Sequence, residues 1–332
     1  MEFALYRYEF EVMEKKDSSA SLFPNQWDNL TPREAFDRKS ELLNELIEKD
    51  YQQLLAEQNK RVAARSLPLL APIGAKSVLP FTNSRKKPLF HKYSSAPKDG
   101  FAILELARLT SVSHRPQPFL TNAVKEDDYK SLHIIIDNRG TYQRVAIEIK
   151  SSVFKETDIV AESLARALSD AFERYGLLVK VVPIRDDKHF WKVVNDRKQF
   201  PFGFKKLCVK FPQINDPKVT EDMRRANMIY REMFHSNLYI IQEPPLGESL
   251  HFDENDEKQR EYIRICTENA DSIKLSPIGG RTFTLGGKAA KTQMMTESER
   301  KSIEEGNRQQ GLFDGNPAQS TKSFMDKAYG KA

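Results

Sequence analysis

The fold is decided by residues 131–184, which read SLHIIIDNRGTYQRVAIEIKSSVFKETDIVAESLARALSDAFERYGLLVKVVPI. Two β-branched runs flank the turn-forming residues Asp137–Gly140, and this arrangement predicts a β-hairpin. A helix follows, because apolar residues recur at spacings of three and four: Val160, Leu164, Ala167, Leu168, Ala171, Phe172 and Tyr175. Gly176 is placed to cap this helix, and Leu177–Ile184 is apolar enough for an interior strand. Together these elements predict an α+β fold with a mixed, largely antiparallel sheet.

A tight turn centred on residues 139–140 also sets the expected register of the hairpin. In that register Ile134 faces Val145, and one face of the hairpin is apolar. Its members are Leu132, Ile134, Ile136, Val145, Ile147 and Ile149. Because side chains alternate along a strand, Glu148 and Lys150 then share the opposite face.

The chain of 332 residues has room for one large domain or two ordinary ones. Its composition, 39% hydrophobic and 30% charged, is typical of a globular protein. No apolar run approaches the roughly 20 residues of a membrane helix, and residues 1–4 do not open a signal peptide. Cys208 and Cys266 stand apart, which predicts neither a disulfide framework nor a zinc ribbon. We therefore expect a cytoplasmic protein with no membrane partner, whose net charge of +5 permits a polyanionic partner without requiring one.

Composition divides the chain into four expected segments. Residues 1–65 hold an N-terminal strand and a helix, and residues 66–100 form a basic, proline- and serine-rich linker or insertion. Residues 101–290 make the α+β core. Residues 291–332 add a short helix and a flexible tail, because little core material follows that helix.

Several element boundaries follow from local signals. In Phe3–Val12, apolar residues fall on one side of the strand and charged residues on the other, which indicates a half-buried strand. Thr31–Glu34 and Thr296–Glu299 are capping boxes, and the helix that the first one begins is expected to run to about Ala64. Ser272–Leu285 indicates a hairpin that turns at its two glycines.

A short peptide in the expected tail, residues 309–314, reads QQGLFD. It resembles the peptide with which bacterial replication proteins dock on the sliding clamp: glutamine, usually leucine, a small or acidic residue, leucine and phenylalanine. The resemblance implies that Gln309 is the polar anchor and that Leu312 and Phe313 fill an apolar pocket of the clamp. The following Met325-Asp326 is also similar to the tails of translesion polymerase subunits, although a second glutamine replaces the usual leucine. The alternative is that the tail folds back and buries the two apolar residues against its own domain.

The segment AIEIKSS, residues 146–152, resembles the third-strand motif of the PD-(D/E)xK nuclease superfamily. That core has the order αβββαβ, which the expected elements between residues 32 and 184 can follow. The resemblance implies that Glu148 holds a divalent metal such as Mg²⁺ and that Lys150 stabilises the attacking water or the developing charge. Both side chains lie on one face of the strand, as this chemistry requires.

A metal site also needs a second carboxylate. In the expected register Glu148 faces Ser131, so Asp137 at the turn lies roughly 20 Å away along the strand. Asp127 and Asp128 precede that strand and are the better candidates for metal ligands. The alternative is a charge pattern on a solvated sheet face with no catalytic role.

A basic stretch interleaves cations with aromatic residues, as single-strand nucleic-acid binders do. Its members are Arg85, Lys86, Lys87, Phe90, His91, Lys92 and Tyr93. We expect Arg85, Lys86, Lys87 and Lys92 to contact DNA, unless the stretch is a plain solvated linker.

Two classes of function remain. The first is a DNA-associated bacterial protein that docks on the sliding clamp and either cuts DNA or interferes with replication, as in phage defence. The second is a non-catalytic α+β adaptor or nucleic-acid-binding module. The sequence leaves the substrate and the oligomeric state open.

Overall fold

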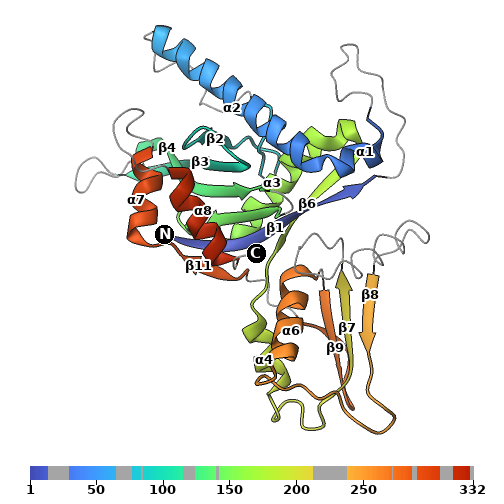
Figure 1. Cartoon of the computed structure of the whole chain (residues 1–332). Helices are drawn as coiled ribbons and strands as arrows, with labels where there is room; N and C mark the ends of the chain where they lie inside the picture. The colour runs from blue at the N-terminus through green and yellow to red at the C-terminus, as the bar shows by residue number, and fades with distance from the viewer. Residues whose placement is uncertain are drawn as a thin grey trace. The chain divides into compact units, whose positions relative to one another are not determined.

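The computed structural model describes residues 1–13, 30–64, 77–83, 85–114, 124–139, 142–211, 238–270, 272–285, 290–306 and 317–329. It confirms the α+β class, with helices packed on antiparallel sheets (Figure 1). No helix among these residues is both long enough and apolar enough to cross a membrane.

The chain forms two compact units. Unit 1 comprises Met1–Val181 and Thr292–Lys331, and unit 2 is built from Val182–Lys291. The boundary therefore falls inside the segment 101–290 that we expected to be one core. Unit 2 begins at the end of β6, the strand Leu177–Pro183, and the chain returns to the first sheet at residue 292.

Unit 1 is organised by a sheet in the order β11-β1-β5-β4-β3-β2, with β6 also paired to β1 (Figure 1). The strands are β1 (Glu2–Val12), β2 (Phe90–Tyr93), β3 (Phe101–His114), β4 (Val124–Asp137), β5 (Arg144–Glu148), β6 (Leu177–Pro183) and β11 (Thr292–Met294). The first strand is buried on both faces from Phe3 to Phe10 rather than half-buried, because α3 (Thr157–Phe172) covers one face and α8 (Pro317–Ala328) covers the other. The elements α2, β3, β4, β5, α3 and β6 follow in the expected αβββαβ order.

The β4–β5 hairpin forms, but its register differs from the expected one. Ile134 pairs with Ile147, and Asp137 pairs with Arg144, so the connection is longer than a two-residue turn. The register is displaced by an even number of residues, which preserves the expected division of side chains between the two faces. As a consequence, Glu148 stands opposite His133 rather than Ser131.

A buried asparagine holds this longer connection in place. The Asn138 side chain accepts a hydrogen bond from the Tyr8 hydroxyl and donates to Ser40 O and Asn44 Oδ1, both at 2.8 Å. Its backbone N–H donates to Gly100 O at 2.7 Å. These partners come from three distant parts of unit 1, so no short-range turn rule could have included them.

One face of the sheet is covered by helices α2 (Lys39–Ala64) and α3 (Thr157–Phe172). On α3, Thr157 and Asp158 lie 2.7 Å from the Tyr6 hydroxyl of β1, and Phe172 packs its ring 5.0 Å from that of Phe10. The apolar stripe that we expected on α3 is the face that is buried against the sheet. After α3, the short 3-10 turn Glu173–Tyr175 ends at Gly176, which has the left-handed conformation of a helix cap, with φ 68°. The expected helix 32–64 is interrupted at Arg38, where α1 (Pro32–Asp37) ends; its capping box at Thr31 is present.

The opposite face is covered from the C-terminal part of the chain by α7 (Glu297–Gly306) and α8 (Pro317–Ala328) (Figure 1). Phe324 of α8 is fully buried, with its ring 5.2 Å from that of Phe3. The Tyr329 hydroxyl lies 2.8 Å from Tyr6 O and 2.6 Å from Val145 O. The expectation of a flexible tail is therefore wrong for residues 317–329, where α8 buries Phe324, Met325 and Ala328.

The expected linker is also partly folded. Residues 77–83 and 85–100 belong to unit 1 and include the edge strand β2. A fully buried carboxylate anchors them: Asp50 of α2 accepts hydrogen bonds from Val78 N (2.8 Å) and Leu79 N (3.1 Å). Its second oxygen lies 2.7 Å from His91 Nε2 and accepts from the Tyr93 hydroxyl at 3.0 Å.

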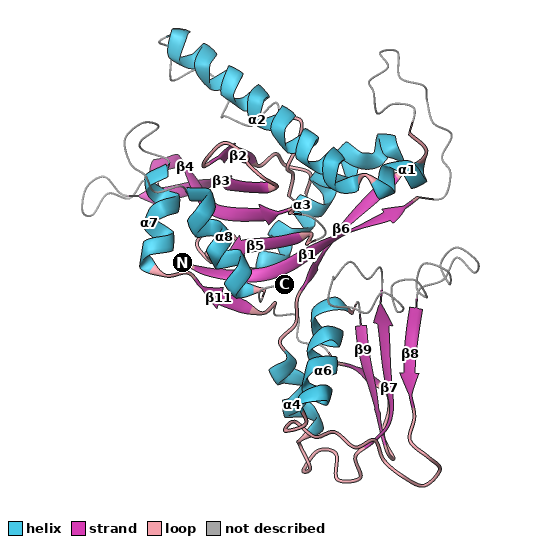
Figure 2. Ribbon diagram, in the orientation of Figure 1, coloured by secondary structure: helices cyan, strands magenta, loops and turns pink. Residues whose placement is uncertain are grey.

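Unit 2 is a smaller α+β unit with the sheet order β10-β9-β7-β8 (Figure 2). Its strands are β7 (Phe204–Phe211), β8 (Leu238–Gln242), β9 (Ser272–Pro277) and β10 (Phe283–Thr284), and its described helices are α4 (Asp187–Val194) and α6 (Glu257–Asn269). The predicted hairpin over residues 272–285 forms, and Gly279 lies in its turn with a positive φ of 77°. Phe190 and Phe204 are at the centre of a core separate from that of unit 1.

Candidate functional site

Glu148, the expected catalytic acid, ends β5 and is almost buried, with 10% of its side chain exposed. Its Oε2 accepts a hydrogen bond from His133 N at 2.9 Å and lies 2.8 Å from His133 Nδ1. Strand β5 ends at Glu148, and its side-chain carboxylate accepts the hydrogen bond of His133 N–H in place of a backbone carbonyl. Without it, this N–H of β4 would have no partner in the sheet. The alternative of a solvated sheet face is wrong for this position, since its neighbour Ala146 is fully buried.

Glu148 belongs to a polar row that crosses four strands on the α8 side of the sheet. Lys92 pairs with Glu105, and Glu105 pairs with His133. The Lys92 Nζ lies 2.8 Å from Glu105 Oε2, and Ser131 Oγ donates to the other oxygen of the same carboxylate. Basic and acidic side chains therefore alternate along the row.

Both carboxyls in this row have lowered pKa values. Burial by itself raises the pKa of Glu148, but the hydrogen bonds and positive charge of His133, with a contribution from Lys150, outweigh it. Burial likewise opposes the shift at Glu105, whose pKa is lowered by hydrogen bonds from Lys92 and Ser131. Both groups are therefore held as carboxylates and act as acceptors.

The residues proposed as metal ligands do not come together with Glu148. In the β3–β4 register Asp128 and Asp127 pair with Thr110 and Ser111, five and six residues from the position opposite Glu148. These separations correspond to roughly 16 and 20 Å along a strand. Among the residues that the structure describes, no group of three or more His, Cys, Asp or Glu side chains could hold a metal ion. Lys150 is exposed and lies past the end of β5.

The basic residues Arg85, Lys86 and Lys87 are all exposed on a tight turn. Asn83 fixes this turn, because its Oδ1 accepts from Arg85 N at 2.9 Å and from Lys87 N at 3.0 Å. A bridge between Thr82 and Pro88 closes it. Within the described part of the chain, none of the three cations forms an ion pair.

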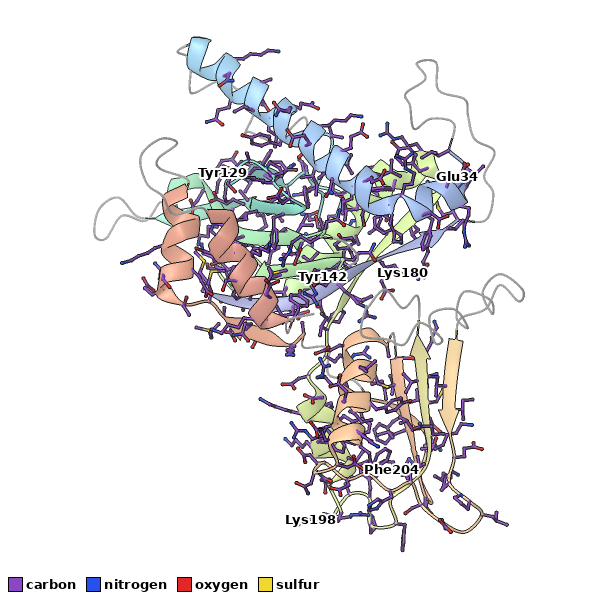
Figure 3. The ribbon with its side chains drawn as sticks, viewed as in Figure 1. Glu34, Tyr129, Tyr142, Lys180, Lys198 and Phe204 are labelled. Atoms are coloured by element: carbon purple, nitrogen blue, oxygen red, sulfur yellow. The ribbon has the colours of Figure 1, made fainter. Side chains whose placement is uncertain are left out.

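The aromatic residues near this turn point to opposite faces of the sheet. His91 and Tyr93 point inward to Asp50 and cannot meet a ligand, whereas Phe90 faces the α8 side of the sheet with Lys92. There Phe90 contacts Tyr129 of β4, with ring centroids 5.6 Å apart and planes at 68°. Tyr129 is labelled in Figure 3. Sequence reasoning missed Tyr129; the alternation that places it on one face with Ser131 and His133 was the available signal.

The clamp-like residues Gln309, Leu312 and Phe313 lie outside the described residues. The two helices that precede and follow them, α7 and α8, pack against each other. Met325 is fully buried and Asp326 forms an ion pair with Arg139, so these two residues serve the fold of unit 1. No protein-family model matches the chain, and no curated protein is detectably similar to it.

Proposed function

We propose that this chain is a DNA-associated protein that binds nucleic acid through the basic turn, defined as Arg85, Lys86 and Lys87, together with Lys92. The observation that carries the proposal is the set of three adjacent cations that are exposed and have no ion-pair partner among the described residues. Phosphates attract such side chains, and each one neutralised releases counterions from the nucleic acid. The net charge of +5 is compatible with this role.

The basic turn is tied to the rest of unit 1 by hydrogen bonds. Its backbone is tied to the Asn83 side chain, and the neighbouring strand β2 is anchored to the buried Asp50 through His91. A preformed turn loses little conformational freedom when it binds, so a larger part of the interaction energy appears as affinity.

The salt dependence of binding tests this proposal. In Arg85→Gln/Lys86→Gln/Lys87→Gln, binding to a labelled DNA duplex should weaken, and the slope of log K against log salt should fall in magnitude by roughly 2 to 3. Fluorescence anisotropy between about 50 and 200 mM salt measures this slope.

A matched control carries the same loss of charge elsewhere. Lys198→Gln/Lys205→Gln/Lys274→Gln removes three exposed lysines of unit 2 and should leave the slope unchanged. Equal slopes for the wild-type protein and the turn variant would refute the proposal.

The second part of the proposal is docking on the bacterial sliding clamp through Gln309, Leu312 and Phe313. What supports it is the match of this peptide to the clamp-binding pattern, since a short peptide with two adjacent apolar residues can fill a partner's groove. A protein that binds both DNA and the clamp would be concentrated at replicating DNA, which suits interference with replication, as in phage defence.

Leu312→Ala/Phe313→Ala should abolish binding to a purified bacterial clamp in a pull-down or by calorimetry. The control is Leu246→Ala/Phe202→Ala, which removes the same two residue types from exposed positions in unit 2, where they are 105% and 71% exposed. Loss of clamp binding in the control as well, or no binding by the wild type, would contradict clamp docking.

Metal-dependent cleavage stays a prediction from the sequence. Its direct test is DNA cleavage with Mg²⁺ by the wild type and by Glu148→Ala and Lys150→Ala. Because the register separates Glu148 from Asp127 and Asp128, we propose the binding function without cleavage.

A further inference from the structure

Beside the basic turn, the structure carries an aromatic patch, which we define as the half-buried Phe90 together with the exposed Leu109 and Tyr129. Tyr129 is 46% exposed and Leu109 is 45% exposed, although both belong to regular strands. They are paired across β3 and β4, and Phe90 reaches Tyr129 from the edge strand β2. Ala107 pairs with Phe90, so a small side chain lies beside the rings.

The patch and the basic turn are close along the chain. Only Pro88 and Leu89 separate Lys87 from Phe90, which corresponds to roughly 10 Å of extended chain. Lys92 lies on the same face as Phe90 and is 50% exposed, but Glu105 already neutralises it. The unneutralised positive charge therefore lies at one end of the patch.

Three acidic positions lie near this surface in the register. Asp128 precedes Tyr129 directly, but alternation along β4 directs it to the opposite face of the sheet. Glu105 lies on the patch side, and its two oxygens are already occupied by Lys92 and Ser131. Asp127, which pairs with Ser111, takes the next strand position on the face of Tyr129, at the end of the patch away from Phe90.

We infer that the aromatic patch binds the unstacked bases of a single-stranded nucleic acid whose phosphates lie on the basic turn. The inference rests on the proposed function and specifies its substrate class. A duplex hides the faces of its bases, whereas a single strand offers them to aromatic rings, and adjacent cations follow the backbone. An apolar patch for a protein partner would not require the unpaired cations beside it.

The experiment compares two probes with the full-length chain: a fluorescein-labelled single-stranded oligothymidylate and a mixed-sequence duplex of the same length. Tyr129→Ala should weaken binding of the oligothymidylate by about 5- to 100-fold, the loss typical of one stacked base. Binding of the duplex should remain unchanged, and so should the salt slope. Tyr129→Phe keeps the ring and should bind like the wild type.

A second readout reports contact directly. An oligonucleotide that contains 5-iododeoxyuridine should crosslink under ultraviolet light to the peptides that hold Phe90 or Tyr129. The control Ile241→Ala removes an apolar side chain from unit 2 that is 54% exposed and should change neither binding nor crosslinking.

The outcomes separate this inference from the proposed function. If Tyr129→Ala binds both probes like the wild type while the basic-turn variant is weakened, the patch serves a protein partner or none, and the inference is overturned. An equal loss on single strand and duplex would also overturn it. If the wild type binds neither probe at low salt, the proposed function itself fails.

Discussion

At the scale of single residues, Glu148 shows how a strand position with catalytic spacing can have a structural task. Its carboxylate is held by the backbone and the ring of His133, at the point where β5 ends and β4 continues. Both contacts are made by Oε2, and the carboxylates expected to complete a metal site lie five and six residues away along β4. The hydrogen-bonded partner also explains the direction of its pKa shift.

The lowered pKa of Glu148 leads to a prediction about acid stability. A carboxyl whose pKa is lower in the folded chain stabilises the fold above its ordinary value of 4.5, and this stabilisation is lost as the pH falls below that value. Glu148→Gln should therefore lower the free energy of unfolding by about 2 kcal/mol at neutral pH. The difference from the wild type should shrink as the pH falls below 4.5. Urea unfolding followed by circular dichroism across this range measures it.

The charged neighbours of Glu148 are His133, Lys150 and, one strand further along the row, Glu105. The control Glu162→Gln makes the same charge change at an exposed position of α3 and should have little effect at any pH. A stability difference for Glu148→Gln that does not depend on pH would contradict the role assigned to the carboxylate.

At the scale of elements, α8 and β2 show how segments with few apolar residues become part of a core. Helix α8 places Phe324, Met325 and Ala328 on one face and buries all three. An arginine strengthens the attachment: Arg139 binds Asp137 on β4 and Asp326 on α8. Strand β2 is attached in a similar way: the buried carboxylate of Asp50 on α2 lies 2.7 Å from His91 Nε2 of the strand.

The docking of α8 predicts a large effect at one residue. Phe324→Ala should lower the free energy of unfolding of unit 1 by about 3 to 5 kcal/mol, as expected when a fully buried phenylalanine ring is removed. Hydrogen exchange of β1, which contacts the ring through Phe3, should accelerate.

Ser323→Ala lies on the exposed side of the same helix and is the matched control, with an expected change within about 0.5 kcal/mol. Equal stabilities of Phe324→Ala and Ser323→Ala would show that α8 does not pack on the sheet.

At the scale of the whole molecule, the chain builds two hydrophobic cores. The core of unit 2 is formed by residues between Phe190 and Leu285, and the N- and C-terminal parts of the chain share the core of unit 1. The candidate nucleic-acid surface belongs to unit 1 alone, because Arg85, Phe90 and Tyr129 all precede residue 181.

Separate cores predict separate responses to mutation. Phe204→Ala should destabilise unit 2 by about 3 to 5 kcal/mol, because Phe204 is buried among Phe200, Phe252 and Phe283. The fluorescence of the buried Trp191, measured in a Trp27→Phe background, reports this transition. Hydrogen exchange in β4 and β5, and binding of DNA, should remain unchanged.

Phe202→Ala, two residues earlier and 71% exposed, is the control and should leave unit 2 about as stable as the wild type. If Phe204→Ala accelerated exchange in both units equally, the two cores would have to unfold together.

Much of the local structure could be predicted because it depends on neighbours in the chain. Both capping boxes, the stripe of α3, its Gly176 cap and the hairpin at Gly279 all form as expected. The alternation of β4 and β5 also placed Glu148 on the correct face. For the candidate site, the sequence identified the exposed cations 85–87 and Phe90, but also His91 and Tyr93, which turn inward.

The features that the sequence did not predict depend on partners distant in the chain. Asn138 sets the length of the β4–β5 connection through Tyr8, Ser40 and Asn44. Phe324 docks because Phe3 lies across from it, and Tyr129 joins Phe90 only because β2, β3 and β4 are neighbours. The sequence was enough to predict β1, α3, β4, β5 and the hairpin of unit 2, with their apolar faces, since those follow from local spacing and side-chain alternation, but it missed α8 and β2. Long-range contacts decide the pairing register, the direction in which each aromatic side chain points, and the division into two units. A local sequence pattern carries no information about such contacts, because their partners are distant in the chain.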